Sequence, residues 1–129
     1  MSKKSLGLLI RKLRKEKGFS YRGLETEMKE KAIKLGMDEI KGLSYVNIVH
    51  LENGRIETKR DVLVLLAKSL DYNEDALLAE GDKLGSDVEE IINKKSDVVP
   101  AFLRSTKNLT NEDWDELSRV VQKMNKKND

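Results

Sequence analysis

LSYVNIVHLENGR, residues 43–55, contains one short helix together with the residues that begin and end it. Ser44 belongs to the residue types whose side chains accept hydrogen bonds from the first turn of a helix, so it predicts an N-cap. The Asn-Gly pair at 53–54 suits the turn that ends a helix. Ile48 and Leu51 lie three positions apart and therefore share a face that packs inward. The other side chains of this helix are left for solvent or a partner.

Two further helices are predicted before this stretch. The first starts at the N-cap Ser5 and ends at Gly18, and the second, which is long, starts at the N-cap Ser20 and ends at Gly36. Residues 36–42 follow with two glycines and no continuous periodicity, which is typical of a connector. The apolar positions at helical spacing in these two helices are Leu6, Leu9, Ile10, Leu13, Leu24, Met28, Ala32, Ile33 and Leu35.

Two more helices are predicted after it. Thr58 is the expected N-cap of the fourth helix, with Asp61 completing a capping-box pattern, and Asn73 is the expected N-cap of a brief fifth helix. With one proline in the whole sequence, we expect an all-α protein with five helices in residues 1–80. The predicted buried positions of the last two helices are Val62, Leu65, Leu66, Leu70, Leu77 and Leu78.

The sequence after residue 80 has a different character. Residues 81–86 contain the last two glycines and few large apolar groups, so we expect a linker there and a separate region at 87–129. That region has helical spacing over 87–95, 98–105 and 110–123. About 40 residues rarely bury enough apolar surface to fold alone, so it either packs on the first domain or, as we favour, dimerises. The predicted dimerisation residues are Trp114, Leu117, Val120, Val121 and Met124.

Composition narrows the function classes. Residues 1–60 have 15 basic and 8 acidic side chains, while residues 61–129 have 10 and 15, so the basic half predicts a polyanionic partner. The sequence has no Cys and one His, which excludes disulfides and the usual structural zinc site. It shows no catalytic pattern, and we expect neither an enzyme nor a cofactor. No signal peptide or membrane span is predicted, so we expect a cytoplasmic protein without a membrane partner.

The order of these signals over residues 5–80 resembles the helix-turn-helix domain of the Cro and phage-repressor type, also called the xenobiotic-response-element family. The most specific part is the sequence LENGR at 51–55, which ends the helix that would enter the DNA groove. The resemblance implies a five-helix, lambda-repressor-like domain that binds double-stranded DNA.

The resemblance also implies roles for particular residues. Tyr45, Val46 and His50 occupy positions that contact bases, and the other expected contacts are to phosphate or sugar. Three alternatives stay open: Val46 and Val49 partly pack on the preceding helix, His50 is merely buried or solvated, and Tyr21 covers the edge of the core. Glu52 is interpreted as structural, accepting hydrogen bonds that fix the turn. The full set of predicted DNA-binding residues is Tyr21, Arg22, Ser44, Tyr45, Val46, Asn47, His50, Asn53, Arg55 and Lys59.

One departure from the family lies between Leu24 and Ile48, which are 24 positions apart and farther than the compact pattern allows. An insertion near 25–42 therefore either extends the second helix or adds a loop. The helix equivalent to the family's second helix could then lie around Leu24 or nearer Gly36, and in the latter case Tyr21 loses its phosphate role. The inserted residues that could reach DNA or a partner are Lys29, Lys31, Lys34 and Lys41.

The expected function is that of a transcriptional regulator, a repressor that binds a palindromic operator as a homodimer. Three alternatives remain. One is an antitoxin whose acidic half covers a basic toxin. Another is a repressor inactivated by a partner metalloprotease, because residues 100–117 resemble the tail of such repressors. The last is a protein-protein adaptor that does not bind DNA.

Overall fold

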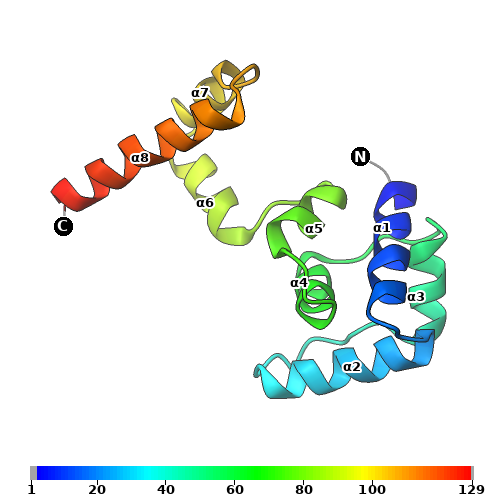
Figure 1. Cartoon of the computed structure of the whole chain (residues 1–129). Coiled ribbons are helices and arrows are strands. Elements are labelled where there is room, and N and C mark those ends of the chain that lie inside the picture. The colour runs from blue at the N-terminus through cyan, green and yellow to red at the C-terminus, as the bar shows by residue number, and fades with distance from the viewer. Residues whose placement is uncertain (1–2, 129) are drawn as a thin grey trace. The chain divides into compact units, whose positions relative to one another are not determined.

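The computed structural model describes residues 3–128, which form eight α-helices and no strand. The prediction of an all-α protein is confirmed. The chain divides into two compact units, Met1–Val88 and Glu89–Asp129. In chain order the helices are α1 (Lys3–Glu16), α2 (Tyr21–Lys34), α3 (Tyr45–Glu52), α4 (Arg60–Ser69), α5 (Glu74–Glu80), α6 (Ser86–Lys94), α7 (Val99–Ser105) and α8 (Asn111–Asn128), as labelled in Figure 1.

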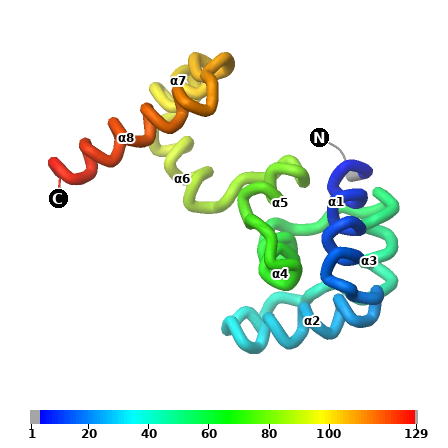
Figure 2. Tube along the Cα trace, viewed as in Figure 1, coloured from blue at the N-terminus to red at the C-terminus, as the bar shows by residue number. Residues whose placement is uncertain are grey.

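The first unit is built around one apolar core shared by α1 to α5. In the tube of Figure 2, α1 lies beside α3, and α4 contacts both α2 and α5. Ile10, Leu24 and Ile48 are fully buried, which joins the first three helices in this core. Burying a side chain of this size contributes about 1.5–3 kcal/mol. The largest fully buried side chains are Ile10, Leu24, Met28, Ile48, Leu51, Leu63, Leu65, Leu66, Leu70, Leu77 and Leu78.

The long separation between α2 and α3 arises in two ways. Helix α2 has 14 residues, and a non-helical connector then runs to Ser44. Leu24, Met28 and Ala32 are spaced by four and face the core. Ile33 and Leu35 belong to the same predicted apolar series but are 71% and 46% exposed. Each residue rotates by about 100° around a helix, so Ile33 points away from the face that contains Ala32.

The predicted helix starts were right at three positions and wrong at two. Ser20, Ser44 and Asn73 are N-caps whose side chains accept a hydrogen bond from the first turn. Ser5 instead lies inside α1, and its Oγ donates to Glu80 Oε2 at 2.7 Å. Thr58 precedes the start of α4, whose N-cap is Lys59 and has no side-chain hydrogen bond. The side chain of Ser5 thus connects α1 to α5 instead of capping a helix.

The second unit consists of part of α6 together with α7 and α8. Helix α8 has 18 residues and continues past the predicted end at 123. A reciprocal capping box begins it: the Thr110 N–H donates to Asp113 Oδ2 at 3.0 Å, and the Asp113 N–H donates to Thr110 Oγ1 at 3.1 Å. None of the residues of α6, α7 or α8 is buried. Within the described chain, no helix is both long and apolar enough to cross a bilayer.

Candidate nucleic-acid interface

Two capped helix N-termini belong to the candidate site. Ser20 Oγ accepts a hydrogen bond from the Gly23 N–H at 2.9 Å, and Ser44 Oγ accepts one from the Asn47 N–H at 3.2 Å. The remaining N–H groups in these first turns carry the positive end of the helix dipole. Helix ends of this kind favour anionic groups such as phosphate.

Arg22 and Tyr45 bring the first turns of α2 and α3 together. The guanidinium of Arg22 lies over the Tyr45 ring, 4.2 Å from its centroid. This distance is within the range of a cation–π contact, which holds the long arginine side chain near the start of α3. The arginine itself stays exposed, while Tyr45 is half-buried. A partner would therefore meet the two side chains as one unit.

The outward face of α3 agrees with the predicted pattern. Ile48 and Leu51 are fully buried, whereas Val46 and Asn47 are exposed. Val46 has 45% of its surface accessible, so nearly half of it is free to meet a partner. His50 is half-buried, and its Nδ1 atom is buried without a hydrogen-bond partner. Helix α3 thus presents one apolar and two polar side chains beside the Arg22–Tyr45 contact.

The C-terminus of α3 is attached to α1 by a buried ion pair. Glu52 is only 2% exposed, and its Oε2 accepts from Arg14 Nε at 2.7 Å while its Oε1 accepts from Arg14 Nη2 at 3.2 Å. Arg11 Nε adds a third bond to Oε1 at 3.3 Å. The hydrogen bonds from Arg14 to the Glu52 carboxylate raise the pKa of Arg14. The prediction that Glu52 accepts hydrogen bonds is confirmed, and the donors are the side chains of Arg11 and Arg14 in α1.

The same arginines also position the chain around this ion pair. Arg11 Nη2 donates to Asn53 Oδ1 at 2.9 Å, and Arg14 Nη1 donates to the carbonyl of Phe19 at 2.9 Å. The Asn53 amide oxygen is therefore engaged within the protein. These bonds fix the turn after α3 and the turn before α2, which are the two segments that flank the candidate site.

Close backbone packing accompanies this ion pair. A Cβ atom at Gly7 would lie 2.3 Å from the Glu52 carbonyl oxygen and 2.6 Å from that of Leu51. Helix α1 can approach the last turn of α3 this closely only because residue 7 has no side chain. Sequence reasoning missed Gly7, Arg11 and Arg14. Two signals were available in the sequence. Gly7 lies inside a predicted helix, and Glu52, if structural and buried, needs a cation as its partner.

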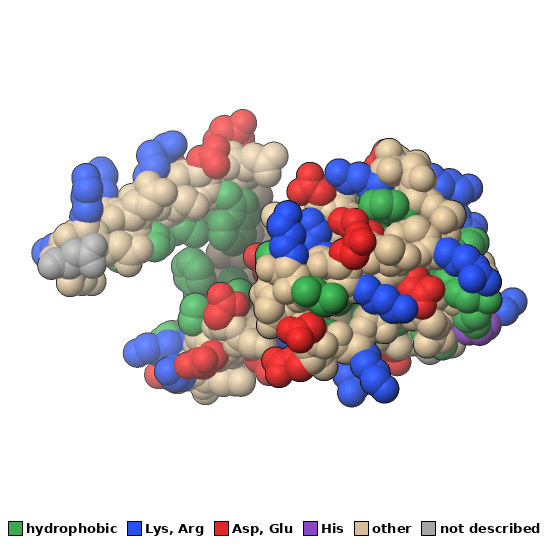
Figure 3. Space-filling view, turned by 90° about the horizontal axis from the view of Figure 1, so that it is seen from below, with side chains coloured by type: hydrophobic (Ala, Val, Ile, Leu, Met, Phe, Trp, Pro, Cys, Tyr) green, Lys and Arg blue, Asp and Glu red, His purple; other side chains and the backbone are tan. Residues whose placement is uncertain are grey.

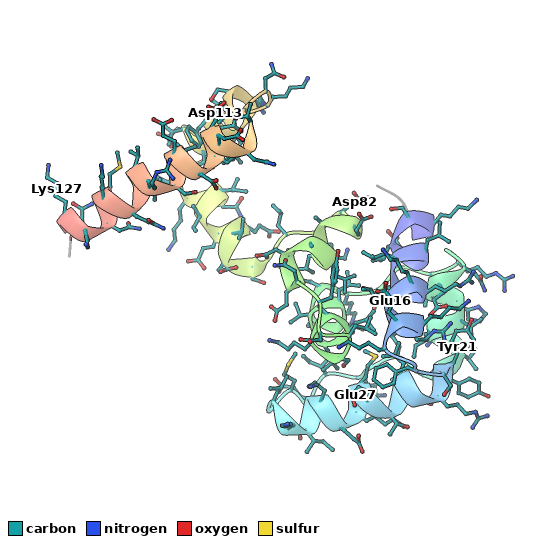
Figure 4. The ribbon with its side chains drawn as sticks, in the orientation of Figure 1. Glu16, Tyr21, Glu27, Asp82, Asp113 and Lys127 are labelled. Atoms are coloured by element: carbon teal, nitrogen blue, oxygen red, sulfur yellow. The ribbon has the colours of Figure 1, made fainter. Side chains whose placement is uncertain are left out.

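Tyr21 lies at the start of α2, close to α1 and α3 (Figure 4). It is half-buried and packs against the core. The guanidinium of Arg14 lies over its ring, 4.1 Å from the centroid. Tyr21 thereby covers the buried ion pair. Only the exposed part of its side chain can contact a partner.

Exposed cations surround the turn after α3. Gly54 has a φ of +73°, and the Arg55 N–H donates to the His50 carbonyl at 2.9 Å, which completes the end of the helix. The Arg55 and Lys59 side chains are both exposed. They extend the positive charge that Arg22 provides at the other end of α3.

The lysines of the inserted segment differ in whether they pair with a carboxylate. Lys29 pairs with Glu25 at 3.7 Å, and Lys31 pairs with Glu27 at 3.8 Å, in both cases within α2. Exposed pairs of this type are weak, but each places a carboxylate next to the lysine and reduces its local field. Lys34 and Lys41 are exposed and lie at the end of α2 and in the connector.

The residues predicted for dimerisation lie in the second unit. Trp114, Val120, Val121 and Met124 are exposed, and Leu117 is half-buried. Figure 3 shows hydrophobic side chains gathered on one face of the helices of this unit. Exposed apolar patches of this kind are typical of association surfaces.

Among residues 3–128, no group of three or more His, Asp or Glu side chains is arranged to hold a metal ion. We compared the chain with protein-family models, with curated proteins and with solved structures, and none of these comparisons finds a match. Function is therefore inferred from the residues and their geometry.

Proposed function

We propose that this chain is a sequence-specific DNA-binding transcriptional repressor that acts in the cytoplasm. In this proposal α1 to α5 form a five-helix, lambda-repressor-like domain in which α2 and α3 are the helix-turn-helix. The observation that carries it is the outward face of α3: Val46, Asn47 and His50 project from a helix fixed by the Glu52–Arg14 ion pair. Exposed cations lie at both ends of that face.

The proposed contacts follow from the chemistry of these side chains. The N-terminal residues of a recognition helix meet base edges in the major groove. Val46 suits the methyl group of thymine, and the polar groups of Tyr45 and His50 suit hydrogen-bonding base edges. Asn47 would contact phosphate or sugar. Arg22 and Arg55 would contact phosphates on either side, which positions α3 without reading sequence. The N-terminus of α3 at Ser44, together with Tyr21, Asn53 and Lys59, would add further contacts to the DNA backbone.

The proposed repressor acts as a dimer. One recognition helix reads only a few base pairs, so useful specificity needs two copies on half-sites about 34–36 Å apart. The exposed apolar residues of the second unit supply a surface on which two copies can associate. A palindromic operator would then mirror the symmetry of the dimer.

Selection of bound DNA from a random pool, using the full chain, tests the proposal. We expect an enriched palindrome whose half-sites are about 10 base pairs apart, centre to centre. Failure to enrich any sequence would contradict sequence-specific binding and favour the adaptor alternative. An enriched site without symmetry would contradict binding as a two-fold dimer.

A change at the start of α3 is expected to alter the preferred sequence. Replacing Tyr45 by Gln and Val46 by Ser removes the apolar contact to a thymine methyl and the Arg22 stacking partner. Because each altered base contact is worth about 1–3 kcal/mol, the enriched base should change at one or two positions in each half-site. Val98→Ser, at an exposed valine of the second unit, is the matched control. An unchanged preference would remove Tyr45 and Val46 as base-contacting residues.

Arg55→Gln tests the backbone contacts. We expect the variant to bind all sequences more weakly and to reduce the slope of log affinity against log salt by up to about one unit, because one phosphate contact is lost. Titrations by fluorescence anisotropy at several salt concentrations measure the slope. Arg104→Gln in α7 should leave it unchanged. If Arg55→Gln also keeps the original slope, Arg55 does not contact phosphate.

A further inference from the structure

Helix α8 carries opposite charges at its two ends. Its first two turns contain four acidic side chains, and the rest of the helix contains four basic ones. Asp113 and Lys127 lie near opposite ends of the helix in Figure 4, and Figure 3 shows the acidic and basic side chains separated in the same way. The acidic end consists of Glu112, Asp113, Asp115 and Glu116, and the basic side chains are Arg119, Lys123, Lys126 and Lys127.

An apolar stripe runs between these ends. Trp114, Leu117, Val121 and Met124 are spaced by three, four and three positions, which is the repeat with which one helix packs along another. Three of these four side chains are exposed, and Leu117 is half-buried. Covering these side chains removes apolar surface from water, so the stripe favours a second helix as its partner. Charge complementarity identifies that partner and its direction.

The geometry points to a second copy of this chain, paired with the first through antiparallel α8 helices about a two-fold axis. This inference rests on the dimer in the proposed function and specifies how it is built. In a parallel pair, acidic ends would lie over acidic ends and basic over basic. In an antiparallel pair, each acidic end lies over the basic end of the other copy. An 18-residue helix is about 27 Å long, more than twice the screening length of about 8–10 Å, so the two ends act separately.

The residue spacing fits one symmetry axis. Pairing Trp114 with Met124 of the other copy centres the axis on position 119, and pairing Leu117 with Val121 gives the same centre. Two pairs of charged residues obey the same relation, since Glu112 then lies level with Lys126, and Asp115 with Lys123. Apolar and ionic pairing therefore agree on one arrangement. The resulting interface is isologous, so it closes after two copies.

Two charge variants of the full chain test this arrangement by sedimentation equilibrium at low salt. The first replaces three of the four basic residues, by Lys123→Glu, Lys126→Glu and Lys127→Glu, so that both ends of α8 are acidic. We expect its dimer dissociation constant to rise at least about tenfold, because attractive pairs at both ends become repulsive. The second adds Glu112→Lys, Asp115→Lys and Glu116→Lys, which exchanges the two ends. We expect its dissociation constant to return to within about threefold of the original.

The exchanged variant also separates pairing from helix stability. Both of its ends are unfavourable to the helix dipole, so loss of helix stability alone would make it the weaker dimer of the two variants. Circular dichroism checks that helix content is retained. Parallel pairing predicts that neither variant changes the dissociation constant. That result, or failure of the exchanged variant to recover, would overturn the antiparallel arrangement.

A third variant distinguishes failure of this inference from failure of the proposed function. Leu117→Glu with Val121→Glu removes the apolar stripe and is expected to give a monomer. If the unmodified chain sediments as a dimer and this variant does too, α8 is not the interface, and the inference fails while the dimer stands. If the unmodified chain is monomeric, both the pairing and the dimer in the proposed function fail. DNA selection with the unmodified chain is scored independently of either outcome.

Discussion

Replacing Glu52 by alanine is expected to lower the free energy of unfolding by about 3–5 kcal/mol. The carboxylate accepts hydrogen bonds from Arg14 and Arg11, and both Glu52 and Arg14 are almost fully removed from solvent. Without the carboxylate, the Arg14 guanidinium would be buried with no opposite charge. Urea denaturation followed by circular dichroism measures the loss. A domain near the lower end of the usual range of about 5–15 kcal/mol would be close to unfolding.

Two controls identify the buried charge as the cause. Glu30→Ala, at an exposed position of α2, should change the free energy of unfolding by less than about 0.5 kcal/mol. Adding Arg14→Met to Glu52→Ala should recover part of the loss, because the unpaired guanidinium is removed with its partner. A loss below about 1 kcal/mol for Glu52→Ala would instead mean that solvent reaches the ion pair.

Gly7→Ala is expected to be the next most damaging change, with a loss of about 3 kcal/mol. In the interior of an exposed helix, alanine would be favoured over glycine by about 1 kcal/mol. Here the added Cβ would lie 2.3 Å from the backbone carbonyl oxygen of Glu52, so α1 and α3 would have to separate. Chemical denaturation gives the change in the free energy of unfolding. A decrease indicates that the steric clash dominates, and an increase indicates that the helix propensity of alanine dominates.

Gly42→Ala is the matched control for this substitution. A Cβ atom at Gly42 would approach its nearest neighbour, Met28, at 3.5 Å, which is an ordinary contact. We expect a change of no more than about 1 kcal/mol there. If Gly7→Ala were equally mild, the close approach of α1 to α3 would not be required for stability.

The parts of the fold that sequence analysis predicted correctly depend on neighbouring residues. Ser44 caps α3 and Asn73 caps α5. In each case a short polar side chain directly before an apolar periodic segment can accept a hydrogen bond from the first turn of the helix. Ile48 and Leu51 are buried because helical spacing puts them on one face. This pattern also placed Val46 and Asn47 on the outward face of α3. The helix to which a residue belongs, and the face of that helix on which it lies, can both be predicted from a few adjacent positions.

The parts that were missed depend on residues far apart in the sequence. Ser5 has the chemistry of an N-cap, but Glu80 lies within hydrogen-bond distance of it after folding. Arg14 belongs to a basic segment with the pattern of a solvated face, and its burial follows from Glu52, 38 positions later. Ile33 continues the apolar series of α2, yet no helix covers it. The contact between Arg22 and Tyr45 likewise requires the crossing of α2 and α3, which local patterns do not specify.

Trp114 is the only tryptophan in the sequence, and it lies in the second unit on the apolar stripe of α8. The three tyrosines, Tyr21, Tyr45 and Tyr72, all belong to the first unit. Selective excitation of the indole therefore gives an optical signal that originates in the second unit alone. Covering a partly exposed indole shifts its fluorescence emission to shorter wavelength, so the emission maximum reports dimer formation. The phenol rings lie at the starts of α2 and α3 and between α4 and α5. The indole absorbs at longer wavelengths than the phenol rings, so the second unit contains an optical reporter of its own, with no dye attached.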